Sequence, residues 1–398
     1  MVGGLLLSGM AMLMGFTALA SLVMGTGVSP QQTIFTVAFG FEAVLLFAAA
    51  IFALQKYRQK PAADREVSLS LSARMIILLV GTTALAILAG YLIAGTDILN
   101  WLFLPLLTIP AIVLPLGALL AMAARKLPLG TRWQSWTVLG LAMTLGPFLL
   151  FALEIILAIF LFIGAVVYVM SQPGLVFELQ RLSEQIMILG PQSEEALELL
   201  APLLTRPGVM AVALLYIAIL VPAIEEILKP IGVWLFASKL GSQAQGFTLG
   251  ALSGVGYALI ETIGVSGQQT GEWASLLASR IGTGLLHITT SALMGAAIVL
   301  AVRNRRYIRL LGTYLLSVFL HGSWNALAML FTFSTLAQEL DQPGLLSTLQ
   351  PSAITAMVIL AAGLFLILIL TNRRLRKTIP PALPEREHVE STDAVKTP

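Results

Sequence analysis

Four apolar stretches of the chain each carry polar side chains spaced four residues apart. The pairs are Glu225/Lys229, Tyr257/Glu261, His287/Ser291 and His321/Asn325. Residues at positions i and i+4 share one face of a helix. An ionisable side chain inside a membrane helix costs about 3 kcal/mol or more, so such faces turn toward the interior of a helix bundle. The spacing therefore predicts one polar site, built by four helices.

The carboxylates of this predicted site suit the activation of water. Glu225 and Glu226 are adjacent in a Val-Pro-Ala-Ile-Glu-Glu-Ile-Leu-Lys-Pro stretch. A carboxylate withdrawn from water can serve as a general base. Lys229 lies at i+4 from Glu225, which favours that pair and leaves Glu226 as the expected free base. A purely structural role for Lys229, as a counter-ion, is equally consistent with the sequence.

The histidines of the predicted site suit two kinds of chemistry. His287 and His321 with Glu261 are donors that can hold a metal such as zinc. Without a metal, the same histidines and Asn325 can donate hydrogen bonds to a developing oxyanion. Asn325 is equally suited to linking helices. The sequence leaves the metal-dependent and the metal-free mechanism both open.

Composition places these residues in a membrane protein. Of the 398 residues, 58% are hydrophobic and 11% are charged, whereas a soluble domain carries about 25% charged residues. The net charge of +3 gives no reason to expect nucleic-acid binding. The absence of cysteine excludes a cysteine nucleophile and thiolate metal ligands.

Apolar runs of about 20 residues predict membrane spans. The runs indicate an all-α, polytopic transmembrane helix bundle with ten spans, at residues 3–25, 33–54, 74–95, 100–124, 136–170, 209–236, 246–265, 281–302, 309–333 and 351–371. The fifth run is long, and either one tilted helix or two helices broken near Gly146–Pro147 would fit it. Glycines 246, 250 and 254 predict a close helix approach in the seventh span.

Basic residues predict the orientation of the spans. With ten spans and both termini cytoplasmic, the cytoplasmic loops and the tail hold 19 of the 23 Lys and Arg residues. Such a bias is typical of cytoplasmic loops, so we expect a multi-pass protein of the cell membrane. Arg280 falls near the outer interface, where we expect it to snorkel toward the headgroups.

The spans divide the chain into five parts. Residues 1–170 form an N-terminal region of five spans without a recognised motif, and 171–208 an extracytoplasmic segment with two expected amphipathic helices, one of them starting after Ser193. Residues 209–333 form a four-span catalytic core. An extracytoplasmic loop and the last span follow over 334–371, and 372–398 is expected to be a basic, disordered cytoplasmic tail. Glu42 and Glu154 are lone intramembrane acids, for which we expect structural or gating roles.

The polar residues also carry a family resemblance. The order Glu225-Glu226-x-x-Lys229, aromatic-x-x-x-Glu261, His287 and His321-x-x-Trp324-Asn325 resembles the PrsW family of intramembrane proteases, which is related to the CAAX prenyl proteases. The resemblance covers about residues 209–330. The family usually has Phe where this chain has Tyr257. The resemblance implies an endopeptidase that cleaves membrane-anchored proteins, including anti-sigma factors.

Other functions fit parts of the pattern. A serine-type mechanism would use Ser253, although Ala251 stands where a rhomboid-type Gly-x-Ser-Gly has glycine. An aspartyl mechanism is excluded because none of the four Asp residues lies in a predicted span. Intramembrane carboxylates with a lysine also occur in proton-coupled transporters, which is one alternative function. A non-proteolytic membrane scaffold is another hypothesis. Because the polar residues gather in four consecutive spans, the sequence favours a single hydrolytic site.

Overall fold

The computed structural model describes residues 1–24, 28–96, 100–190, 193–204, 206–267, 272–339 and 348–378. Within these residues the chain is helical and has no strand, only an isolated β-bridge between Glu66 and Thr131. The helices are α1 (Val2–Met24), α2 (Pro30–Tyr57), the 3₁₀ turn η1 (Pro61–Asp64), α3 (Ala73–Ala94), α4 (Asn100–Ala123), α5 (Arg132–Met143), α6 (Leu145–Met170), α7 (Pro173–Leu189), α8 (Glu194–Leu204), α9 (Pro207–Leu215), the π-helix η2 (Tyr216–Leu220), α10 (Val221–Leu228), α11 (Ile231–Phe236), α12 (Gln243–Ser266), α13 (Trp273–Asn304), α14 (Tyr307–Glu339) and α15 (Gln350–Arg376).

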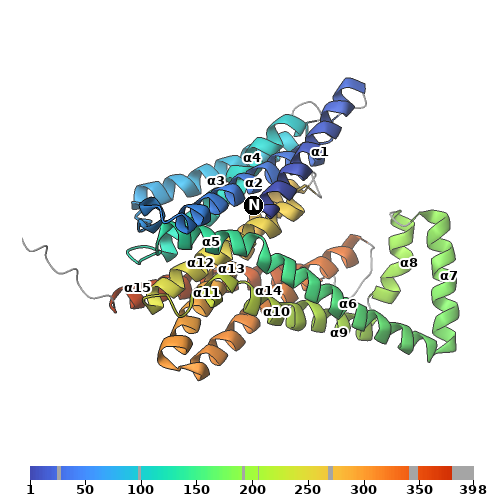
Figure 1. Ribbon diagram of the computed structural model, residues 1–398. Helices are drawn as coiled ribbons and strands as arrows, with labels where there is room; N and C mark the ends of the chain where they lie inside the picture. The colour runs from blue at the N-terminus through green and yellow to red at the C-terminus, as the bar shows by residue number, and fades with distance from the viewer. Residues whose placement is uncertain are drawn as a thin grey trace, which may run out of the picture.

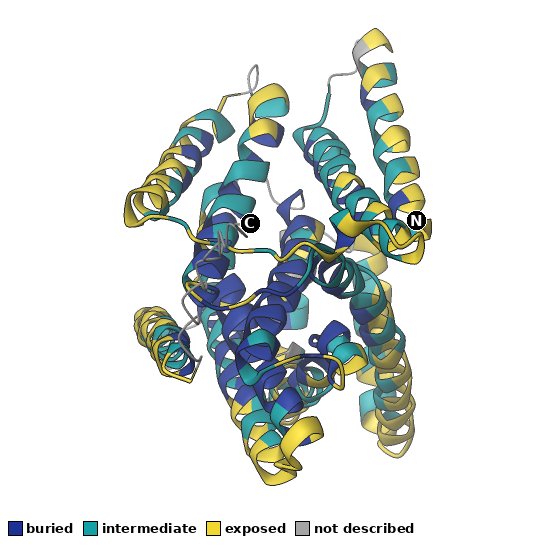
Figure 2. Ribbon diagram, turned by 60° about the vertical axis from the view of Figure 1, so that its left-hand side comes forward, coloured by how far each residue is buried: buried dark blue, intermediate teal, exposed yellow. Residues whose placement is uncertain are grey.

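Ten helical stretches of the described chain are long and apolar enough to cross a membrane. They coincide with the ten predicted spans, so the expected all-α, polytopic bundle is confirmed. Buried residues gather at the centre of the bundle and exposed residues on its outer helices (Figure 2). Most of the exposed large side chains are apolar ones on the outer helices, as expected where lipid is the solvent.

The fifth span consists of two helices, which settles the choice that the sequence left open. The break between α5 and α6 falls at Thr144, whose backbone has φ −130° and ψ −73°. Pro147 has no N–H and cannot donate to the carbonyl of Met143. The hydroxyl of Thr144 donates to the carbonyl of Gly140 at 2.6 Å. From this break α6 runs toward the end of the molecule that carries α7 (Figure 1).

The sixth span is interrupted twice. The π-helix η2 separates α9 from α10, and Pro230 separates α10 from α11. Carbonyls released at Pro230 find side-chain donors: the Ser253 hydroxyl donates to the carbonyl of Lys229 at 2.5 Å, and the Trp234 indole donates to that of Ile227 at 3.0 Å. The broken helix is tolerated at membrane depth because these side chains replace the missing backbone donors.

Helices α12 and α13 form the centre of the core and touch through their backbones. A Cβ atom on Gly250 would lie 2.2 Å from the carbonyl oxygen of Ser291, and one on Gly254 would lie 2.4 Å from that of His287. Any larger residue at these positions would force the helices apart. The predicted close approach of the seventh span is therefore confirmed, and it fixes the main chain that carries His287.

The segment after the fifth span forms the two expected short helices, α7 and α8. The hydroxyl of Ser193 accepts a hydrogen bond from the backbone N–H of Ala196 at 3.1 Å, which confirms the predicted start of α8. Figure 1 shows both helices at one end of the molecule, lying across the direction of α6. At the other end of the chain, α15 continues past the predicted limit of 371 to Arg376. The predicted disorder of 372–398 is therefore wrong for 372–376, which are helical, and residues 379–398 lie outside the described residues.

Candidate active site

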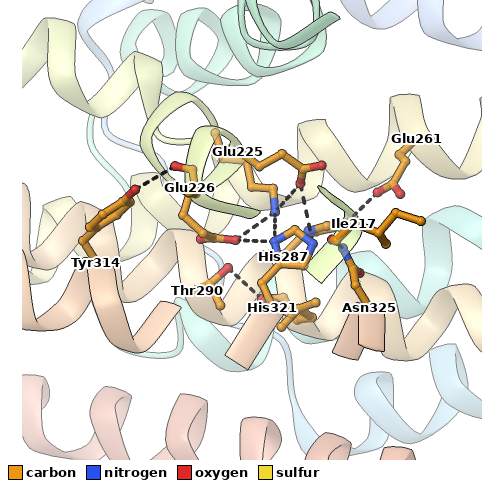
Figure 3. Close-up of polar contacts among 12 residues, drawn as sticks. Ile217, Glu225, Glu226, Glu261, His287, Thr290, Tyr314, His321 and Asn325 are labelled. Atoms are coloured by element: carbon orange, nitrogen blue, oxygen red, sulfur yellow. Dashed lines mark hydrogen bonds and ion pairs between the residues drawn. The ribbon is translucent and has the colours of Figure 1, made fainter. Parts of the chain in front are cut away.

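The polar faces of the four spans meet inside the bundle. Figure 3 shows Glu225 and Glu226 from α10, Glu261 from α12, His287 from α13 and His321 from α14 around one centre. Four of these side chains, those other than Glu261, are buried. The structure therefore brings together all the charged residues and histidines that the helical spacing groups into one site.

Lys229 ties the two adjacent glutamates together. Its Nζ lies 2.9 Å from Oε2 of Glu225 and 2.9 Å from Oε1 of Glu226. The expectation that Lys229 pairs with Glu225 alone and leaves Glu226 free is corrected by this geometry. Both carboxylates lie within one turn of Lys229 on the same helix, and its long flexible side chain reaches i−3 and i−4 equally well.

Each histidine is held by a carboxylate through one ring nitrogen. Nε2 of His287 lies 2.6 Å from Oε2 of Glu261, and Nδ1 of His321 lies 2.8 Å from Oε1 of Glu226. Nδ1 of His321 also lies 3.1 Å from Nζ of Lys229. Carboxylate–histidine pairs of this kind fix ring orientation in metal sites and hydrolases alike.

Glu225 lies close to both histidines. Nε2 of His321 lies 3.7 Å from Oε2 of Glu225. Nδ1 of His287 is buried and has no hydrogen-bond partner in the part of the chain that the structure describes. One donor atom from each of Glu225, His287 and His321 lies within 4.8 Å of the others. Glu261, which the sequence places in the metal set, is not in this group and contacts Nε2 of His287.

Three other candidates contact the backbone or pack beside the site. The amide of Asn325 donates to the carbonyl of Ile217 in η2 at 3.0 Å, so it links α14 to the sixth span, one of the two roles that the sequence left open. The hydroxyl of Ser253 donates to the backbone carbonyl of Lys229. Tyr257 lies with its ring edge-on to His287 at a centroid distance of 5.0 Å.

Two residues take a larger part than the sequence indicates. Arg280 forms an ion pair with Glu261 at 2.9 Å and does not snorkel away from the site. Glu154 is half-buried on α6, which packs against α10 and α12, the helices that carry Glu225 and Glu261. The only sequence signal for Glu154 is its position in an otherwise apolar run, and that signal does not say which helix face is turned inward.

The donor set fits a divalent cation. Three carboxylates, of Glu225, Glu226 and Glu261, face two permanent cations, Lys229 and Arg280. With both histidines neutral, one negative charge remains for a cation to balance. The unpartnered Nδ1 of His287 is a buried lone pair, which metal coordination would satisfy.

Buried ionisable residues at the centre of ten membrane-spanning helices define a polytopic membrane protein with a polar site inside the bilayer. Residues 134–364, more than half of the chain, match the family described as PrsW family intramembrane metalloprotease. The chain belongs to this family. The matched region begins in α5 and so extends beyond the four spans that carry the motifs. No curated protein and no solved structure gave a match.

Removing the charge of Lys229 should destabilise the protein. In Lys229→Met, two buried carboxylates lose their counter-ion, and breaking a buried ion pair costs about 3 to 5 kcal/mol. We expect a lower melting temperature in detergent, with partial recovery in Lys229→Met/Glu226→Gln because one of the stranded charges is gone. Lys239→Met, at an exposed lysine, is the matched control. A wild-type melting temperature for Lys229→Met would show that the pairs contribute nothing.

Proposed function

We propose that this chain hydrolyses peptide bonds of membrane-anchored proteins within the bilayer, with Glu225 accepting the proton of the attacking water. Family membership supports an intramembrane protease. The observation that carries the residue assignment is the shared orientation of His287 and His321. Each is held by its own carboxylate, and a ring nitrogen of each lies within 4.8 Å of a carboxylate oxygen of Glu225.

The proton position on His287 favours metal binding. The carboxylate of Glu261 accepts a hydrogen bond and therefore holds the imidazole proton on Nε2. Nδ1 of the neutral ring then carries a lone pair, which binds a metal but cannot donate to an oxyanion. When the Nδ1–H of His321 donates a hydrogen bond to Glu226, Nε2 of His321 likewise carries a lone pair that can bind a metal.

We infer zinc as the metal and Glu225, His287 and His321 as the residues that would hold it. Two histidines and one carboxylate are a donor set that zinc hydrolases use. When bound, zinc supplies Lewis acidity, which acidifies water and polarises a carbonyl group. Glu226 and Glu261 orient the two rings from behind, and Arg280 in turn holds Glu261.

With a metal bound, one carboxylate oxygen of Glu225 would hold it and the other would accept the proton; without a metal, the whole carboxylate is free to act as the base. Glu225 takes a proton from water while the water oxygen attacks the carbonyl carbon of the scissile bond. The proton then passes to the departing amide nitrogen, and the C–N bond breaks. Lys229 holds Glu225 in place, and a carboxylate in this buried position meets few competing waters.

Glu225→Gln should abolish cleavage. The amide keeps the shape of the side chain but cannot accept the proton, and general-base assistance is worth about 10²- to 10⁴-fold. Glu226→Gln should retain partial activity, because it weakens the orientation of His321 without removing the base. The assay is cleavage of single-span reporter proteins co-reconstituted with the enzyme in liposomes.

Ser253→Ala is the control in that assay and should remain active, because the Ser253 hydroxyl only donates to a backbone carbonyl. Wild-type rates for Glu225→Gln and Glu226→Gln together would refute a glutamate mechanism. Loss of activity in Ser253→Ala alone would replace it with a serine mechanism.

Metal content should depend on the two site histidines. We expect the purified wild type to hold about one equivalent of zinc and His287→Ala/His321→Ala to hold none. Glu261→Ala should weaken zinc affinity about 10- to 100-fold, since it removes the hydrogen bond behind His287. Elemental analysis measures this, with His388→Ala, the third histidine of the sequence, as the control. Equal zinc in the wild type and the double variant would place the metal elsewhere.

We also propose that both termini lie in the cytoplasm and that the protein resides in the cell membrane. The distribution of 19 of 23 basic residues supports this orientation. A fluorescent reporter fused after Lys377 should be active inside the cell, and a phosphatase inserted at residue 190 should be active outside. The reverse pattern would overturn the orientation.

A further inference from the structure

Helix α6 turns one stripe of residues toward the bundle without being fully covered by it. Leu150, Glu154, Leu157 and Leu161 follow the i, i+4, i+7, i+11 spacing of a single helix face. Leu150 is buried, whereas the other three are only half-buried. The buried residues of α6 are Gly146 and Leu150, both near its start at the Thr144 break. Protein covers the beginning of this face and leaves the continuation open.

The half-buried face of α6 lies next to the helices of the candidate active site. Helix α6 packs against α10, which carries Glu225, and against α12, which carries Glu261. The side chain of Glu261 is 38% exposed and that of Glu225 is 10% exposed, whereas that of Glu226 is fully covered. The protein therefore leaves the site least covered at the two carboxylates whose helices pack against α6.

Neighbouring helices cover the start of this face more completely than its continuation. Along its length α6 packs against α5, α10, α12 and α7. In the sixth span, α6 contacts α10, which begins at Val221. The π-helix η2, which precedes α10, packs against α14. The contact between the two spans is thus made at the α10 level, next to the start of α6.

We propose that the face of α6 formed by Glu154, Leu157 and Leu161 is the docking surface for the transmembrane helix of the substrate, and that Glu154 binds its unwound segment. The proposal rests on the proposed function. The occupant is a single apolar helix, because a substrate anchored in the bilayer reaches a site at this depth from the lipid side. Leu157 and Leu161 offer it an apolar surface that is continuous with the site.

The chemistry of Glu154 matches what such a substrate must expose. A peptide bond inside a helix is shielded, so cleavage requires local unwinding, and each N–H set free in lipid needs an acceptor. The carboxylate of Glu154 accepts such hydrogen bonds at the entrance to the site. An unwound substrate would thereby supply hydrogen-bond donors to a lone acid in a span that otherwise consists of apolar residues.

Disulfide trapping tests the docking surface directly. The chain has no cysteine, so single cysteines can be introduced without background. Leu157→Cys lies on the inward stripe, and Ile159→Cys, 52% exposed on the lipid side, is its matched control. Both cysteine variants are made in the Glu225→Gln background and are oxidised together with a single-span reporter. The reporter is one that the wild type cleaves, and it carries one cysteine beside its cleavage site. A disulfide requires Cα atoms within about 7 Å.

We expect a mixed disulfide from Leu157→Cys and little from Ile159→Cys. Equal yields, a higher yield from Ile159→Cys, or no adduct from either would overturn the docking surface. Cleavage by the wild type is needed only to choose the reporter, and the adduct itself forms without turnover, so a failed cleavage and a failed adduct are told apart. If Glu225→Gln cleaves at the wild-type rate, the mechanism fails while the adduct pattern still decides this proposal.

Kinetics test the role of Glu154. Glu154→Leu should raise KM for the reporter about tenfold, the value of one charge-assisted hydrogen bond, with a smaller change in kcat. Glu154→Gln keeps an acceptor oxygen and should recover most of the loss. Glu42→Leu removes the other lone intramembrane acid, far along the chain on α2, and should leave KM unchanged. The assignment fails if Glu154→Leu keeps the wild-type KM or if Glu42→Leu raises KM equally, and melting temperatures of all three identify any variant that misfolds.

Discussion

The ammonium group of Lys229 between Glu225 and Glu226 is the constraint on which the site depends. It is fully covered by protein, and so is its partner Glu226. Three charges in such a place are stable only when they balance one another closely. The pairing therefore fixes the positions of α10 and of the side chains next to it, because a lost partner would leave a buried charge unbalanced.

The interruptions of the sixth span make this pairing compatible with a membrane. Pro230 stops α10 directly after Lys229, and the carbonyl that would be left unpaired is taken by Ser253 on α12. The same contact locks the end of α10 to the helix that carries Glu261. One hydrogen bond thus satisfies a free backbone carbonyl and also holds together two helices of the site.

Helical periodicity was enough to predict which residues share the site, because i, i+4 spacing determines the face of a helix. It was not enough to predict partners. Lys229 pairs with both glutamates, and Glu261 contacts His287 at Nε2. These contacts depend on side-chain length and on how α12 crosses α13, which helical spacing does not give. The ten spans followed from apolar length alone. The inward turn of Glu154 did not, because an apolar helix with one acid has no second polar residue to indicate its face.

The π-helix η2 has a consequence for how this site is encoded. A π-turn carries one residue more than an α-turn, and each residue of an α-helix rotates the chain by about 100°. Deleting one residue from 216–220 would let this turn close as an ordinary α-turn and would keep the direction of Glu225 and Glu226 relative to α9 nearly unchanged. Deleting one residue from α9 would instead rotate the two acids by about 100° relative to the start of that helix. The π-helix is therefore the place in the sixth span where the chain can lose a residue and still direct both acids toward His321.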